Sequence, residues 1–237
     1  MGTLQGIIFK ATENASKQLD ALGYLTTNVA NYNTVGYKSQ RFENYLEADG
    51  RIQGKVRTDY SNGELLSTKR TLDIAIDGTG FIPVTRKDGL VAYTRDGSFS
   101  VNAEGYLVTQ DGFLVADGIK IPANYYNLKF MEDGTIKVMR EKDLEPEVIG
   151  KIPLITFNDP ENLESIEGNK LVASEKSGKP ILLKDHENIK QGKLERSNVN
   201  IFNSVNDVLI VNGSIISSTR LMKVMDEIYR QSVNLRQ

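Results

Sequence analysis

One histidine and no cysteine limit the chemistry that this chain can do. The 237-residue sequence carries His186 alone, inside the charged run Lys184-Asp185-His186-Glu187. Sites that need two histidines, zinc–thiolate sites and thiol nucleophiles are therefore excluded. No nucleophile-elbow pattern and no base-orienting pattern stands beside His186 to make it part of a catalytic triad. The sequence predicts a solvated loop here, and a protein that is not an enzyme.

Acidic residues followed by glycine form the second group with possible chemistry, because Asp-rich turns can coordinate calcium. No twelve-residue loop closed by glutamate surrounds Asp111 or Asp133, so turn formation explains the pairs better. Gly78-Thr79-Gly80 lacks the third glycine and the helix of a dinucleotide site. We therefore expect no metal, no cofactor and no bound phosphate. The pairs are Asp77-Gly78, Asp88-Gly89, Asp96-Gly97, Glu104-Gly105, Asp111-Gly112, Asp117-Gly118 and Asp133-Gly134.

The composition argues against two large classes of partner. A formal net charge of −2 gives no overall attraction to nucleic acid or to an anionic membrane. No apolar run approaches the roughly 20 residues that a membrane span needs. Met1–Lys10 has neither the basic start nor the long apolar stretch of a signal peptide. We expect no nucleic-acid partner, no membrane span and no cleavable signal.

Two long amphipathic segments, residues 3–31 and 203–235, predict helices at the two ends of the chain. Asn203 or Ser204 is the expected cap of the second helix. Each helix has an apolar stripe that needs a partner, first the other helix in an antiparallel pair and then neighbouring copies. Contacts between copies that do not close on themselves build a helical filament. The predicted assembly interface consists of Leu4, Ile8, Ala11, Ala15, Leu19, Leu22, Val29, Val208, Ile215, Met222, Met225 and Tyr229.

Short apolar runs alternate with turn dipeptides between these helices, which predicts hairpins with type I′ turns. Residues 39–70 are polar and weakly periodic, and we expect an extended connector with a short helical turn around Phe42, Tyr45 and Leu46. The predicted fold class is α+β. Its terminal helices pair as a coiled-coil-like bundle, and its central β domain is mainly antiparallel and barrel- or sandwich-like. The predicted segments are 1–38 (helix and exit loop), 39–70 (connector), 71–200 (β domain) and 201–237 (second helix).

The exit loop after the first helix is rich in helix-ending residues. Asn28, Asn31 and Asn33 compete with the helix for backbone hydrogen bonds, and Gly36 can redirect the chain. We expect Gly36 at a positive φ where the chain leaves the helix.

Four stretches, in the same order, resemble motifs of the bacterial flagellar rod and hook proteins. Residues 28–38 resemble N-A-N-x-x-T-x-G-[FY]-K, and residues 72–81 resemble L-D-x-A-I-x-G-x-G-F. Residues 93–99 resemble Y-T-R-x-G-x-F, and residues 192–200 resemble G-x-L-E-x-S-N-V-N. Residues 208–213 depart from the M-I-x-x-Q-R-x-[YF] of rod proteins. The motif positions are Asn28, Asn31, Thr34, Gly36, Tyr37, Lys38, Gly78, Gly80, Phe81, Arg95, Gly97, Phe99, Ser197, Asn198, Val199 and Asn200.

The resemblance implies a structural subunit of the flagellar basal-body rod, the axial drive shaft that carries torque from motor to hook. It implies self-association, contact with other rod and hook proteins and with the bushing rings, and a place in the periplasm-spanning rod. It also implies passage through the flagellar type III export apparatus without signal cleavage. The short spacing from Lys38 to Gly63 favours the proximal over the distal rod type. The alternative is a carbohydrate- or ligand-binding β module on a coiled-coil stalk, with Tyr93, Phe99, Tyr106 and Phe113 as an aromatic platform.

Overall fold

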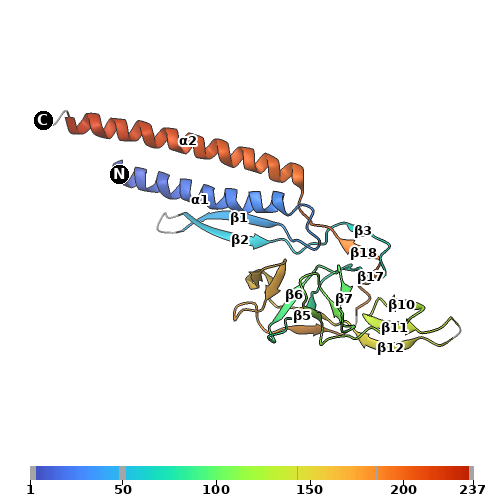
Figure 1. Cartoon of the computed structure of the whole chain (residues 1–237). Helices are drawn as coiled ribbons and strands as arrows, with labels where there is room; N and C mark the ends of the chain where they lie inside the picture. Colours follow the sequence, from blue (N-terminus) through green and yellow to red (C-terminus); the bar gives the residue numbers. More distant parts are fainter. Residues whose placement is uncertain (1–3, 48–51, 143, 185, 235–237) are drawn as a thin grey trace. The chain divides into compact units, whose positions relative to one another are not determined.

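The computed structural model describes residues 4–47, 52–142, 144–184 and 186–234 (Figure 1). The chain forms two compact units that are not continuous in sequence. The first unit contains residues 1–32, 39–59 and 199–237, and the second contains residues 33–38 and 60–198. The α+β class is confirmed, with helices at the ends of the chain and antiparallel strand pairs between them. The four segment boundaries drawn from the sequence stay a prediction.

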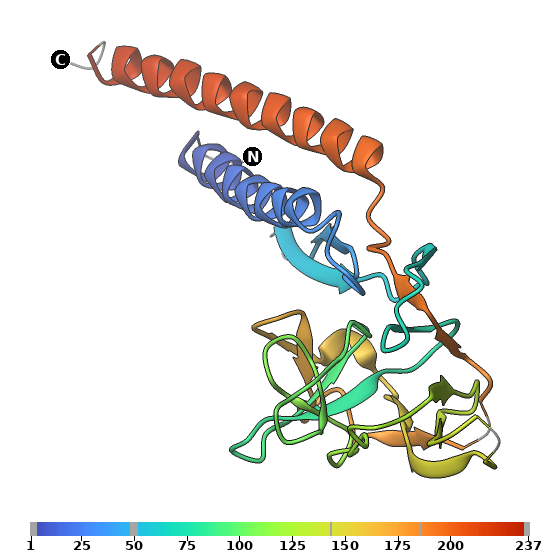
Figure 2. The ribbon, with the colours of Figure 1, turned by 45° about the vertical axis from the view of Figure 1, so that its right-hand side comes forward.

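The first unit holds both long helices, α1 (Leu4–Ala30) and α2 (Ile201–Asn234). They run side by side in opposite directions, as Figures 1 and 2 both show. Two hydrogen bonds fix this register. The Gln18 side-chain amide donates to the Ser214 hydroxyl at 2.8 Å, and the Thr12 hydroxyl donates to the Met222 sulfur at 3.5 Å. The two helices therefore cover part of each other's apolar surface.

Helix α2 begins at Ile201, two residues before its predicted start. Asn200 caps it, because its side-chain oxygen Oδ1 accepts a hydrogen bond from the Asn203 backbone N–H at 3.1 Å. An N-cap oxygen of this kind satisfies an N–H that has no partner inside the helix. The predicted caps, Asn203 and Ser204, are wrong. Several residues with capping side chains stand in a row here, and sequence alone could not rank them.

A hairpin of strands β1 (Gln40–Leu46) and β2 (Ile52–Thr58) completes the first unit. The Phe42 ring stacks on Tyr24 of α1, with 5.7 Å between ring centroids. The same ring lies over Gly54, where an added Cβ would come within 2.1 Å of it. The predicted helical turn around Phe42, Tyr45 and Leu46 is wrong, because pairing with β2 and packing on α1 decide the conformation.

The second unit is built from antiparallel sheets around one main core. Its largest sheet has seven strands in the order β14-β15-β6-β5-β9-β8-β7, and a second has three in the order β10-β11-β12. Three pairs complete it, namely β13 with β16, β17 with β4, and β18 with β3. The strands are β3 (Leu65–Ser67), β4 (Ile74–Ile76), β5 (Ile82–Thr85), β6 (Val91–Thr94), β7 (Ser100–Val101), β8 (Leu107–Val108), β9 (Leu114–Val115), β10 (Asn127–Phe130), β11 (Thr135–Met139), β12 (Glu147–Lys151), β13 (Leu154–Thr156), β14 (Glu164–Ile166), β15 (Lys170–Val172), β16 (Ile181–Leu183), β17 (Ile189–Gln191) and β18 (Lys193–Glu195).

Aromatic side chains of the second unit lie in its interior. Tyr93 packs edge-on against Phe157 with centroids 4.9 Å apart, in a small cluster with Phe81 and Leu163. Phe99 is 1% exposed and belongs to the main core. Tyr93, Phe99 and Phe113 are all buried, so the exposed aromatic platform of the alternative hypothesis does not exist.

The Asp-Gly pairs do form turns, but they are not type I′ turns. That type needs a positive φ at both central residues. Among the described residues, the glycines of five of these pairs have a positive φ and none of the aspartates does. The aspartate instead stabilises the turn with its side-chain carboxylate. Asp133 Oδ1, for example, accepts a hydrogen bond from the Thr135 N–H at 3.0 Å. An aspartate that bonds the backbone two residues further on is an Asx turn, which fixes a loop without calcium.

A buried anchor and a candidate assembly surface

A fully buried carboxylate, Glu195, joins the exit loop to the rest of the second unit. Its oxygen Oε1 accepts hydrogen bonds from Lys38 Nζ at 2.7 Å and from the Gly63 N–H at 2.9 Å. Its oxygen Oε2 lies 3.4 Å from Nη1 of Arg95. All three side chains are at most 6% exposed, so water does not screen these charges. One carboxylate thus holds two cations from segments far apart in the sequence.

Both cations of this anchor have further partners. Lys38 Nζ donates to the Ser61 carbonyl at 2.6 Å. Arg95 donates to the Asn62 side-chain oxygen at 3.2 Å, and its guanidinium lies over the Phe81 ring at 5.4 Å. Burial lowers the pKa of Arg95, and the Glu195 carboxylate opposes that shift. Breaking such a pair leaves an uncompensated charge inside the protein.

Gly36 brings the exit loop against this anchor, at a φ of +66°. The predicted positive φ is confirmed. The Gly36 N–H donates to the Glu195 backbone carbonyl at 2.8 Å. A Cβ at this position would lie 2.6 Å from the Arg95 carbonyl carbon and 2.8 Å from the Asp96 nitrogen, both of which are backbone atoms. Any other residue would therefore meet both backbone strain and a contact that cannot move aside.

We predict that Gly36→Val destabilises the second unit by at least about 1–3 kcal/mol, the cost of a strained φ alone, and by more because of the contact with Arg95. Gly89→Val is the matched control, because Gly89 also has a positive φ, of +90°, but nothing lies within 4 Å of an added Cβ. Urea unfolding of the two variants measures the difference. Equal losses would mean that the close approach to Arg95 contributes nothing.

Asn28, also from the first motif, acts in the first unit instead. It is 4% exposed near the end of α1. Its amide Nδ2 donates to the Gln40 carbonyl at 2.7 Å, and its Oδ1 accepts the Gln40 N–H at 2.9 Å. This pair of hydrogen bonds holds Gln40, the first residue of β1, against α1. The Asn28 amide bonds both the N–H and the C=O of Gln40, as a paired residue in a neighbouring strand does.

We predict that Asn28→Ala weakens the attachment of β1 by about 1–3 kcal/mol, because both backbone groups of Gln40 lose their partner. Amide exchange at Gln40 in the assembled protein should then be about 5 to 150 times faster. Asn44→Ala on the same strand is the control, because Asn44 is exposed. Equal exchange at Gln40 in both variants would contradict the role of Asn28.

The remaining motif residues lie at the end of α1, within the second unit and just before α2. Gly97 lets strand β4 approach, since an added Cβ would lie 1.8 Å from the Ile74 carbonyl oxygen. The Asn198 N–H donates to the Tyr37 carbonyl at 3.4 Å, and the Tyr37 N–H to Thr34 at 3.3 Å. Burial raises the pKa of Tyr37. The Asn31 side-chain amide donates to the Thr27 carbonyl. Gly78 and Gly80 both have a positive φ. Ser197 and Val199 are buried.

The predicted interface residues fall on more than one side of the helices. On α2, Val208, Ile215 and Met222 are half-buried and Met225 is buried, whereas Tyr229 is 45% exposed. On α1, Ala11, Ala15, Leu22 and Val29 are half-buried, and Leu19 is 57% exposed. The side chains of Leu4 and Ile8 lie outside the described part. Contact of these residues with a neighbouring copy stays a prediction.

A second apolar stripe on α2, which sequence reasoning missed, is exposed. Phe202, Leu209 and Ile216 are 85%, 64% and 47% exposed, and their spacing of seven places them on one face of the helix. We call this the outer stripe. Further exposed apolar side chains lie beside it or continue along the helix, namely Val205, Ile210, Leu221, Val224 and Ile228. An apolar surface this long on a folded chain indicates an association site.

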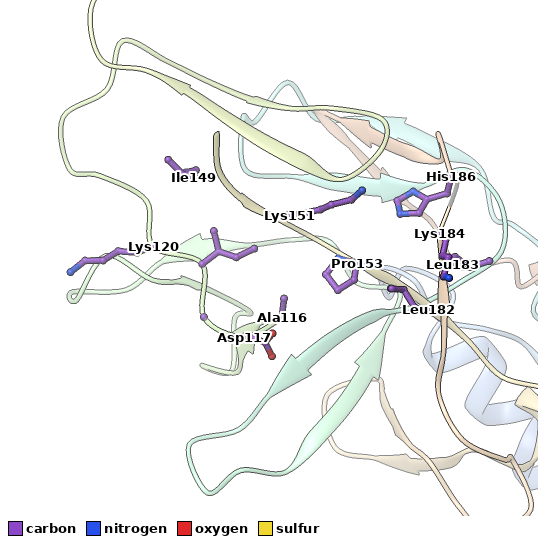
Figure 3. Close-up of a pocket in the computed structure, with 12 residues that line it drawn as sticks. Ala116, Asp117, Lys120, Ile149, Lys151, Pro153, Leu182, Leu183, Lys184 and His186 are labelled. Atoms are coloured by element: carbon purple, nitrogen blue, oxygen red, sulfur yellow. The ribbon is translucent and has the colours of Figure 1, made fainter. Parts of the chain in front are cut away.

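His186 lies in a pocket of about 720 Å³ in the second unit (Figure 3). The predicted solvated loop is wrong at this side chain, which is 7% exposed. Burial lowers the pKa of His186, and the nearby charge of Lys151 lowers it further, so the ring is neutral at pH 7. Figure 3 shows Lys151 extending toward the ring. Among the described residues no cluster of three acidic or histidine side chains could hold a metal.

Glu195 is the residue that the sequence contained but did not single out. It stands inside the fourth motif, directly after Leu194, where a charged residue gives no sign of burial. Two motif cations, Lys38 and Arg95, had no predicted carboxylate partner, and this could have indicated that Glu195 is buried between them.

The sequence is similar to those of known flagellar proteins. Residues 75–138 match the flagellar hook protein FlgE/F/G D1 domain. The flagellar basal-body rod protein FlgG of Caulobacter vibrioides is 29% identical over 98% of this chain and the whole relative. Two FlgG proteins of Buchnera aphidicola, from the Acyrthosiphon pisum and Schizaphis graminum subspecies, are 33% and 34% identical over 76% of this chain and 80% of each relative.

These relatives carry the same name, and the Caulobacter alignment covers nearly all of the chain. The chain belongs to the flagellar basal-body rod protein family, and it is a structural subunit of the rod.

Proposed function

We propose that the subunit builds the rod by packing the outer stripe of α2 against the helices of neighbouring copies. The supporting observation is the exposure of Phe202, Leu209 and Ile216 on a helix whose other apolar side already lies against α1. Interlocked helices of many copies would then form a coiled-coil-like inner wall. Torque applied at the motor passes along that wall to the hook.

Helix α2 also has the length and apolar composition of a membrane-crossing helix, and it is the one such helix among the described residues. Arg220, Lys223 and Arg230 interrupt its far half with charge. The absence of a membrane span stays a prediction. We assign the apolar surface to protein neighbours, because a rod subunit needs contacts with copies on several sides.

Cryo-electron microscopy of isolated basal bodies carrying a tagged chain tests the proposal. Density for the tag within the rod, with α2 bordered by helices of other copies, is the expected result. An α2 that faces solvent or lipid in the assembled particle would overturn it. The same map tests the proximal position, which the names of the relatives do not state. Tag density beside the hook would contradict that position.

We also propose that the terminal helices are stable only in the assembly. Ordering a backbone costs about 1–2 kcal/mol per residue, and a single helix pair offers few contacts to offset this cost. Residues 1–30 and 203–237 of a dilute monomer should exchange their amide hydrogens fast, whereas the second unit stays protected. Strong protection of both helices in a proven monomer would defeat this proposal.

Two further partners are proposed from the family alone. We infer that the chain travels through the flagellar type III export apparatus and touches the bushing rings around the rod. Mass spectrometry of the chain from purified rods tests the first point, since an N-terminus beyond the first two residues would reveal cleavage. Cross-linking of intact basal bodies tests the second.

A further inference from the structure

Apolar and basic side chains both line the pocket beside His186. Pro153, Leu182 and Leu183 are among its apolar lining residues (Figure 3). Among the described lining residues, three lysines stand against one aspartate, Asp117. The lysines are Lys120, Lys151 and Lys184. A volume of about 720 Å³ lies within the range of pockets that hold a short peptide or small molecule.

Two of the three lysines make only weak contacts within the protein. Lys151 lies 3.9 Å from Asp133, and both side chains are half exposed. Lys120 lies over the Tyr106 ring at 5.7 Å. His186 adds no positive charge, because its ring is neutral. The pocket therefore suits a ligand that brings both an apolar side chain and carboxylates.

The loop between β11 and β12 has this chemistry. It contains Glu141, Lys142, Leu144 and Glu145, and Leu144 is 52% exposed. Among the described residues, neither Glu141 nor Glu145 has an ion-pair partner, whereas Glu147 pairs with Arg140 at 3.1 Å.

We propose that the β11–β12 loop of one copy inserts Leu144 into the pocket of a second copy, with Glu141 and Glu145 against its lysines. The loop and the pocket are different surfaces, so the contact is heterologous and repeats along an open assembly. This inference rests on the proposed function, because it needs copies stacked in the rod. It assigns the second unit its own contact between copies, independent of the outer stripe.

The absence of cysteine allows a direct test in basal bodies from cells. A full chain with Leu144→Cys and Leu182→Cys should give disulfide-linked ladders of copies on mild oxidation. The control combines Leu144→Cys with Val101→Cys, an exposed position that does not line the pocket, and should give no ladder. Lys151→Glu with Lys184→Glu should lower the ladder yield about fivefold or more. Adding Glu141→Lys and Glu145→Lys should restore it.

The outcomes separate this inference from the proposed function. Basal bodies that contain the chain but give no ladder would overturn the inference and leave the function standing. A cross-link to a different protein, or charge reversals that neither lower nor restore the yield, would overturn it equally. A chain missing from the basal body would overturn both.

Discussion

A chain carrying Leu209→Glu and Ile216→Glu will fail to enter the rod, and cells that depend on it will not swim. Covering a leucine or isoleucine contributes about 1.5–3 kcal/mol, so two such contacts represent about 3–6 kcal/mol. Their loss corresponds to a roughly 150- to 25,000-fold weaker association between copies. Each new carboxylate would also be taken out of water without a partner, which adds to the loss.

Two comparisons separate assembly from folding. Leu209→Met with Ile216→Val keeps the stripe apolar and should preserve rods and swimming. Both native side chains are exposed in the single chain, so the glutamate variant should unfold in urea within about 0.5 kcal/mol of the original. Normal rods built from the glutamate variant would remove the outer stripe from the proposed interface.

Glu195→Gln will cost the second unit about 3–5 kcal/mol of unfolding free energy, the usual penalty for removing one partner of a buried ion pair. The amide retains the shape of the side chain but leaves the charges of Lys38 and Arg95 uncompensated at 6% and 4% exposure. Urea unfolding followed by circular dichroism measures the loss. The exit loop should exchange its amides faster, because Gly36 and Lys38 both lie against this residue.

Glu64→Gln is the matched control for this change. Glu64 is also a strand-region glutamate in an ion pair, with Arg196 at 3.5 Å, but its side chain is 78% exposed. Exposed pairs contribute about 0–1 kcal/mol. Similar losses in the two variants would mean that burial of Glu195 does not decide its contribution.

The sequence could predict features that depend on local chemistry. Regular apolar spacing located both helices, and the asparagines before Gly36 located the turn and its positive φ. The resemblance named Lys38 and Arg95 as motif positions, and the structure places both cations against Glu195. These features follow from residue types and short spacings, which a single chain displays directly.

Features that depend on distant partners could not be predicted. Phe42 forms part of a strand because Tyr24 and Gly54 provide a place for its ring, and neither is near it in sequence. The stripe with Val208 and Ile215 was found, yet the stripe with Leu209 and Ile216 was missed. Both have heptad spacing, so only the structure tells which one α1 covers. Glu195 was missed for the same reason, since its burial comes from three other segments.

The anchor around Glu195 can form only late in the synthesis of the chain. Lys38 and Glu195 are 157 residues apart, so the bond between them closes almost the whole length of the second unit. A ribosome adds about 5–20 residues per second, and Glu195 therefore emerges roughly 8–30 seconds after Lys38. Contacts of such long range form late in folding. Until Glu195 has been synthesised, Lys38 lacks the carboxylate that binds it in the folded chain, so the exit loop is fixed in place only at the end of synthesis.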